Sequence, residues 1–247
     1  MLLKIILSLV FILALSGCAE NRSSFFIQNM VVPSDECTVS SDRESLFSTW
    51  GLWDIGVAAR WVARPLLLNE MEDSSKLNPM ASQTNYIQVD GAWVALLDEE
   101  ENVLFDEYFV HAPVTVYANG GSTALVFPAV DFDLYDSVSG LWGGTMYSID
   151  QLCSSPIMSK ILLRIRVTGV TSGGTDVETP YFLFPVQVCC GCSIYYPPDA
   201  MCTEEAKGGD DVPCQPGQDG WTDCRQCVEA IPELCDPFDD DFSNPWH

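Results

Sequence analysis

Short stretches of alternating apolar and polar residues, separated by glycine-containing turns, constrain the fold of this chain more than any other feature. In WDIGVAARWVA (53–63) every second residue from Trp53 to Ala63 is apolar, the period of a half-buried β-strand. Stretches such as Asn119-Gly120-Gly121 supply the backbone angles of tight turns. The pattern predicts a mainly β protein built as an antiparallel β-sandwich, immunoglobulin-like or jelly-roll-like. Further strands are expected at 85–98, 103–110, 113–118, 123–134, 160–170 and 179–189.

The distribution of the 11 cysteines divides the chain near residue 189. The residues from there to the end are rich in cysteine, proline and glycine, so we expect disulfides to order a segment with little apolar core. We therefore predict a β-sandwich domain over 37–188 and a loop-rich, disulfide-rich segment over 189–247. The cysteines of this segment are Cys189, Cys190, Cys192, Cys202, Cys214, Cys224, Cys227 and Cys235.

The N-terminus has the pattern of a secretion signal. One charge, Lys4, precedes an apolar block from Ile5 to Leu15 that is too short to span a bilayer and is followed by small residues. We expect residues 1–17 to be a signal peptide and 18–36 to be a tether that leads to the sandwich. No later stretch of the sequence is apolar enough to span a membrane as a helix.

The sequence Leu15-Ser16-Gly17-Cys18 resembles the lipobox of bacterial lipoproteins. The resemblance implies a diacylglycerol on the Cys18 thiol, cleavage just before Cys18, and acylation of the new amine. Several acyl chains would anchor the protein to a membrane without a transmembrane helix. Ala19 is not the aspartate associated with inner-membrane retention in enteric bacteria, so the resemblance favours the outer membrane of a bacterial cell envelope. The tail, PCQPGQDGWTDC (213–224) included, resembles those of uncharacterised cell-surface proteins of predatory or social bacteria.

Lipidation of Cys18 would leave ten cysteines, which can form disulfides with none unpaired. Cys37 and Cys153 either pair with each other or bridge into the tail, and the pairing within the tail stays open. The thiols of CCGC (189–192) and CRQC (224–227) have the spacing of zinc ligands or of a redox pair. In an oxidising compartment we expect them to be disulfides instead, and we predict no metal and no cofactor.

Charge limits the partners, because 35 acidic residues against 11 basic ones oppose binding to nucleic acid. Acidic clusters could supply oxygen ligands for calcium, although none matches an EF-hand loop. A calcium-dependent adhesin is therefore one alternative function. The clusters are Asp98–Glu101, Asp131/Asp133/Asp136, Asp210/Asp211 and Asp236/Asp239/Asp240/Asp241.

Catalytic signals are weak. The two histidines are His111, inside an expected strand, and His247, the last residue, and the sequence has no nucleophile-elbow, phosphate-loop or HExxH motif. An extracytoplasmic hydrolase that uses two carboxylates as acid and base is a second alternative. We expect no enzyme but a lipid-anchored binding or structural module.

The tryptophans divide into two groups. Trp53, Trp61 and Trp93 lie on apolar strand faces and are expected in the core. Those near turns, Trp50, Trp142 and Trp221, are candidates for an exposed aromatic binding surface. Besides the membrane, the expected partner is another envelope protein or a glycan.

Overall fold

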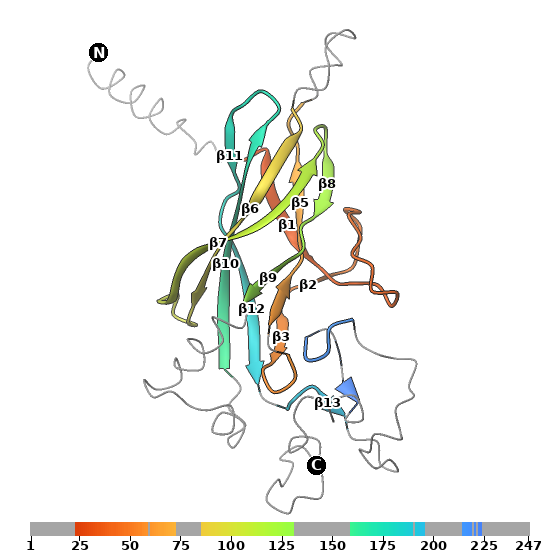
Figure 1. Ribbon diagram of the computed structural model, residues 1–247, viewed down its shortest axis with the longest axis vertical. Coiled ribbons are helices and arrows are strands. Elements are labelled where there is room, and N and C mark those ends of the chain that lie inside the picture. The colour runs from red at the N-terminus through yellow and green to blue at the C-terminus, as the bar shows by residue number, and fades with distance from the viewer. Residues whose placement is uncertain are drawn as a thin grey trace, which may run out of the picture.

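The computed structural model describes residues 23–58, 60–72, 85–130, 159–189, 191–195, 214–218, 220 and 222–223. Every regular element within these residues is a β-strand, as Figure 1 shows. The predicted mainly β fold is confirmed. No helix among the described residues is long and apolar enough to cross a membrane.

The larger sheet has six strands. Five strands follow one another in the order β3-β12-β10-β6-β7, and the sixth, β11, pairs with β10. β3 runs parallel to β12, whereas the other neighbours are antiparallel. The strands are β3 (Gly51–Asp54), β6 (Ile87–Leu97), β7 (Val103–Val116), β10 (Ser159–Thr171), β11 (Asp176–Glu178) and β12 (Phe182–Cys189).

The smaller sheet has four strands in the order β2-β1-β5-β8. Two additional pairs complete the described strands, β4 with β9 and β13 with β14. The bounds are β1 (Phe25–Val31), β2 (Phe47–Ser48), β4 (Trp61–Ala63), β5 (Pro65–Asn69), β8 (Gly121–Ala124), β9 (Phe127–Val130), β13 (Ile194–Tyr195) and β14 (Thr222–Asp223).

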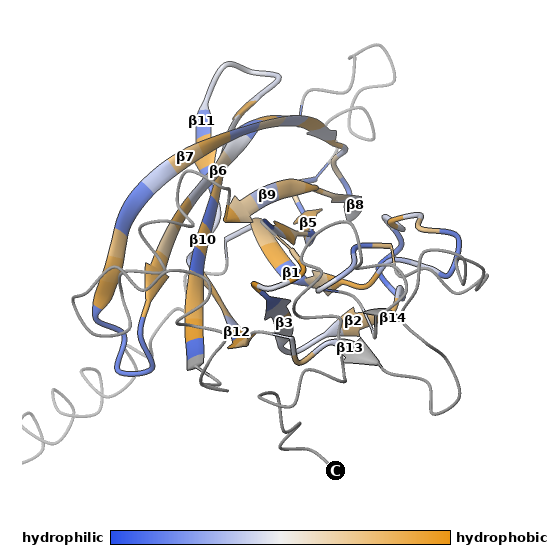
Figure 2. Ribbon diagram, turned by 60° about the horizontal axis from the view of Figure 1, so that its bottom comes forward, coloured by the Kyte–Doolittle hydropathy of each residue, from blue (hydrophilic) through white to orange (hydrophobic). Residues whose placement is uncertain are grey.

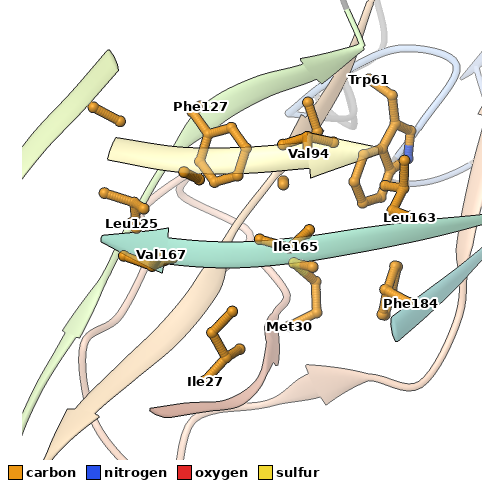
Figure 3. Packing of buried hydrophobic residues seen from close by; sticks show 14 of the residues in the cluster. Ile27, Met30, Trp61, Val94, Leu125, Phe127, Leu163, Ile165, Val167 and Phe184 are labelled. Carbon is orange, nitrogen blue, oxygen red and sulfur yellow. The ribbon is translucent and has the colours of Figure 1, made fainter. Parts of the chain in front are cut away.

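The main hydrophobic core lies between these two sheets. Leu163, Ile165 and Val167 of β10 are buried in it, and the residues that alternate with them are less buried because successive side chains leave opposite faces of a strand. Figure 3 shows these side chains together with Ile27 and Met30 of β1. The same alternation is visible as hydrophobic and hydrophilic segments along β10 in Figure 2.

Most predicted strands are present, with some changed boundaries. The stretches 85–98 and 179–189 contain β6 and β12, and 160–170 lies within β10, which confirms these three strands. The stretch 123–134 is divided between β8 and β9 as far as residue 130, and residues 131–134 lie outside the described residues. The stretch 103–110 and residues 113–116 of the stretch 113–118 belong to the single strand β7. Pro113 is tolerated there because β7 is the outermost strand of its sheet, where a missing backbone N–H need not break a ladder.

The prediction of one strand over 53–63 is wrong. β3 ends at Asp54, a turn follows, and β4 begins at Trp61. The chain turns because the Asp54 carboxylate accepts the amide of Gly56 and the Asp54 carbonyl accepts the amides of Val57 and Ala58. Alternation therefore continues across a turn that the hydrophobic pattern does not reveal.

The tether predicted over 18–36 is wrong for residues 25–31, which form β1. This strand pairs with β5 on one side and with β2 on the other, so its backbone is part of the sheet. Phe25, Ile27 and Met30 are buried in the main core. Burial of these side chains and pairing of the backbone make residues 25–31 part of the folded domain.

Candidate functional site

A cavity of about 300 Å³ opens at the end of the two sheets where β1 ends and β3 begins. Its lining comes from β1, β3, β4 and β12, and three aromatic rings, Trp50, Trp61 and Phe184, contribute to it. Figure 3 shows Met30, Trp61 and Phe184, which belong to three different strands. Apolar surface dominates such a lining, as in most sites that bind a ligand or an anchoring side chain. Arg64, Ser48, Ser193 and Gln218 add polar groups.

Gly51 allows the aromatic wall of this cavity to form. A Cβ atom at residue 51 would lie 2.8 Å from Cζ2 of Trp61 and 3.1 Å from Cε1 of Phe184. The two rings themselves pack with centroids 5.7 Å apart, and the Trp61 indole donates to the Leu52 carbonyl at 3.1 Å. Only glycine permits this approach of Trp61 to β3.

Trp50 stands at the cavity with 53% of its surface exposed, which agrees with the exposure predicted from its place near a turn. Trp53 and Trp61 are buried, as predicted. The prediction for Trp93 is wrong, because this residue is half-buried outside the main core and packs on Phe109 with centroids 5.2 Å apart. Trp142 and Trp221 lie outside the described residues.

Residues 214–218 of the tail pack against this end of the two sheets. The Gln218 side chain accepts the Val62 amide at 2.9 Å and donates to the Val62 carbonyl at 2.6 Å, so it pairs with β4 as a neighbouring strand would. The Gly217 carbonyl accepts the Asp54 amide at 2.7 Å, and Arg64 donates to the Gln215 side chain at 2.9 Å. A cysteine-rich segment thus supplies both lining and support for the cavity.

Two disulfides lie in the described part of the chain. Cys37 pairs with Cys214, so the bridge into the tail is the alternative that the structure favours for Cys37, and Cys189 pairs with Cys192. Both pairs confirm the expectation that these cysteines are oxidised. The other predicted cysteines, Cys18, Cys153, Cys190, Cys202, Cys224, Cys227 and Cys235, lie outside the described residues.

Asp54 is fully buried beside the Cys189–Cys192 disulfide. Its Oδ1 accepts the amides of Gly56 at 3.0 Å and Gly191 at 2.7 Å, and its Oδ2 accepts the amide and hydroxyl of Ser193 at 2.7 and 2.8 Å. Burial raises the pKa of Asp54 above its ordinary value of 3.8, and these hydrogen bonds oppose that rise.

The side chains of Asp54, Cys189 and Cys192 are close enough to be considered as metal ligands, since their ligand atoms lie within 4.8 Å of one another. In this structure the two sulfurs bond to each other and the carboxylate already accepts four hydrogen bonds. The arrangement therefore holds the loop after β12 against the end of β3.

The sequence interpretation missed Asp54 because it placed this residue on the solvent-exposed face of a strand. It also did not identify Gln218 and Gly51 as parts of the site. One local signal was present, since aspartate two residues before glycine is typical of a turn in which the carboxylate accepts a backbone amide. The groups from residues 191, 193 and 217 that complete the site have no signal in the sequence near Asp54.

Among the other candidate residues, His111 is exposed on β7, and His247 lies outside the described residues. Asp98 accepts the amides of Glu100 and Asn102 and the side-chain amide of Asn102, so its carboxylate organises the turn between β6 and β7. The acidic clusters at 131–136, 210–211 and 236–241 lie outside the described residues.

No family model matches the sequence, and no curated protein matches it. Among solved structures the chain is similar to the solution structure of a protein titled as late embryogenesis abundant (LEA), at 11% identity and a TM-score of 0.37. The similarity covers 71% of this chain and 77% of that chain, and it assigns no function.

Proposed function

We propose that this protein is a lipid-anchored, non-catalytic binding module of a bacterial cell envelope. The observation that carries the binding role is the apolar, aromatic-lined cavity with the half-exposed Trp50 beside it. Proteins bind small ligands and anchoring side chains in concave sites of this kind.

The anchoring role rests on the sequence Leu15-Ser16-Gly17-Cys18. The nearest described strand is β1, which begins at Phe25, close to Cys18 in sequence, and runs to Met30 and Val31, which line the cavity. Figure 1 shows the start of β1 and β13 toward opposite ends of the molecule.

Metabolic labelling with radioactive palmitate tests the anchor. We expect the wild-type protein to incorporate label and Cys18→Ala to incorporate none, because the acylated thiol is gone. Trp50→Ser serves as the matched control, since it alters the cavity rim and should keep the label. Label that persists on Cys18→Ala contradicts lipidation at this residue.

A further inference from the structure

Exposed hydrophobic side chains gather at the cavity mouth. Val32, Leu46, Phe47 and Trp50, here called the mouth patch, are 37%, 80%, 57% and 53% exposed. Val32, Leu46 and Phe47 are close in space because Val31 and Phe47 are paired in the ladder between β1 and β2, and the Val32 amide donates to the Leu46 carbonyl at 3.0 Å. Trp50 joins them at the cavity, which both Val32 and Trp50 line. Contiguous exposed apolar side chains beside a cavity are typical of interaction sites.

The cavity complements this patch. Val32 and Trp50 belong to the mouth patch and also line the cavity, so the two features form one continuous apolar surface. A concave aromatic-lined site at the centre of an apolar patch is the arrangement in which an interface buries an anchoring side chain of its partner. Among the described strands β2 is also the last of its sheet, so an extended segment could pair with its outer side.

The surroundings of the mouth patch are acidic. Residues 33–45 form the loop whose two ends meet at Val32 and Leu46, and this loop exposes four carboxylates. They are Asp35, Glu36, Asp42 and Glu44. Arg43, the one basic residue of the loop, pairs with Glu70 at 3.3 Å.

The charge selects among the possible occupants. A second copy of a chain with net charge −24 would place acidic loops against one another, which repulsion opposes. A partner with basic residues around an apolar side chain would satisfy both the acidic loop and the cavity. We propose that the mouth patch and cavity dock a protein segment that inserts an aromatic or aliphatic side chain flanked by lysine or arginine. This inference rests on the proposed binding role and adds the class of partner.

Fluorescence anisotropy with labelled peptides tests this docking site. The full protein, isolated from cells and placed in phosphatidylcholine nanodiscs, is titrated with the peptide Lys-Lys-Gly-Trp-Gly-Lys-Lys. Two comparison peptides replace either the tryptophan by serine or the four lysines by glutamate. We expect the first peptide to bind at least about tenfold more tightly than either comparison, and to weaken as salt is raised.

Substitutions assign the binding to the mouth patch. Trp50→Ser and Phe47→Ser should each weaken binding of the basic tryptophan peptide by about tenfold or more, because each removes exposed apolar contact. Tyr117→Ser is the matched control, since Tyr117 is 60% exposed but outside the patch, and it should leave binding unchanged. All three positions are exposed, so circular dichroism should show the same folded state.

Several results would overturn the proposal. If the serine peptide binds as tightly as the tryptophan peptide, charge alone accounts for binding. If Tyr117→Ser weakens binding as much as Trp50→Ser does, the mouth patch is not the binding site. Failure of every peptide to bind, or self-association that Trp50→Ser abolishes, excludes the proposed partner, and maltoheptaose binding that requires Trp50 favours a glycan. Palmitate labelling is unaffected by any of these outcomes, so failure of the docking site and failure of the anchor are distinguishable.

Discussion

Two aspartates, Asp54 at the end of β3 and Asp98 just after β6, organise turns with nearly the same local hydrogen bonding. In each, Oδ1 accepts the amide two residues ahead at 3.0 Å and a second amide at 2.7 Å. The second donor of Asp98 is Asn102, four residues away, whereas that of Asp54 is Gly191, 137 residues away. One turn is local, and the other joins distant parts of the chain.

The pKa values of the two carboxyl groups shift in opposite directions. The side-chain hydrogen bond from Asn102 leads the causes that lower the pKa of the exposed Asp98 below 3.8, whereas burial raises the pKa of Asp54 above 3.8. Both groups accept several hydrogen bonds, so the difference lies in solvent access. The pKa of a carboxyl group in a turn can thus be raised or lowered, depending on whether distant elements cover it.

The largest expected effect comes from Asp54→Asn. An asparagine would offer one acceptor oxygen and would direct N–H groups at other donors, so buried amides would lose partners. We expect the free energy of unfolding to fall by about 3 kcal/mol at pH 7, measured by urea denaturation. A loss no larger than that of Asp98→Asn would break the comparison between the two turns.

Removal of the neighbouring disulfide should have the next largest effect. Cys189→Ser combined with Cys192→Ser frees the loop that presents Gly191 and Ser193 to Asp54, and the short closed loop suggests a loss of about 2 kcal/mol. Adding Asp54→Asn should then cost less than it does alone, because its donors are already released. Strictly additive losses would show that the disulfide and Asp54 act independently.

Ser193→Ala should have a smaller effect. It removes the hydroxyl donor at 2.8 Å from Oδ2 but keeps the backbone donor, so we expect a loss of about 1.5 kcal/mol in the same denaturation experiment. Ser45→Ala is the control, because the Ser45 hydroxyl also donates to one neighbour, the Asp42 carbonyl, but at an exposed site. Equal losses of unfolding free energy in Ser193→Ala and Ser45→Ala would show that burial does not strengthen the contribution of the Ser193 hydroxyl.

Asp98→Asn should have the smallest effect, and its pH dependence should be opposite to that of Asp54→Asn. Because its folded-state pKa is lowered, Asp98 stabilises the fold above pH 3.8 and loses this contribution as the pH falls through the lowered pKa. Because the pKa of Asp54 is raised, its contribution is largest below pH 3.8 and decreases as the pH rises through the raised pKa.

Unfolding free energies of the wild type and both variants, measured from pH 3 to pH 7, test these signs. The loss caused by Asp98→Asn should grow as the pH rises toward 3.8 and then become constant. The loss caused by Asp54→Asn should shrink as the pH rises above 3.8. If the losses in unfolding free energy of the two variants changed in the same direction with pH, the role assigned to burial would be contradicted.

Several strands could be predicted from the sequence because alternation is a local property. In β10 the apolar side chains at every second residue correspond to the buried face, and neighbours in the chain are enough to reveal it. The same rule misled across the turn after Asp54, and β1 was missed because its position next to the expected signal peptide suggested a tether. In these two places the partners that decide the structure, β5 and the loop after β12, are distant in sequence.

Part of the candidate site was also accessible from the sequence. The exposure of Trp50 followed from its position near a turn. Oxidation of Cys37, Cys189, Cys192 and Cys214 followed from the abundance of cysteine in a chain whose N-terminus has the sequence pattern of a secretion signal. The cavity itself could not be predicted, because its walls combine β1, β3 and β4 with Phe184 of β12 and Gln218 of the tail, which are distant from them in sequence.

The sequence by itself determined the period-two strands, the expectation of disulfides and the lipobox resemblance, because each depends on residues that are adjacent or can be counted. Only the tertiary structure decided that Cys37 pairs with Cys214, that Gln218 completes β4, and that Asp54 is buried. The physical reason is that disulfide partners, side-chain pairing and burial depend on contacts between distant segments, which form when the sheets pack together.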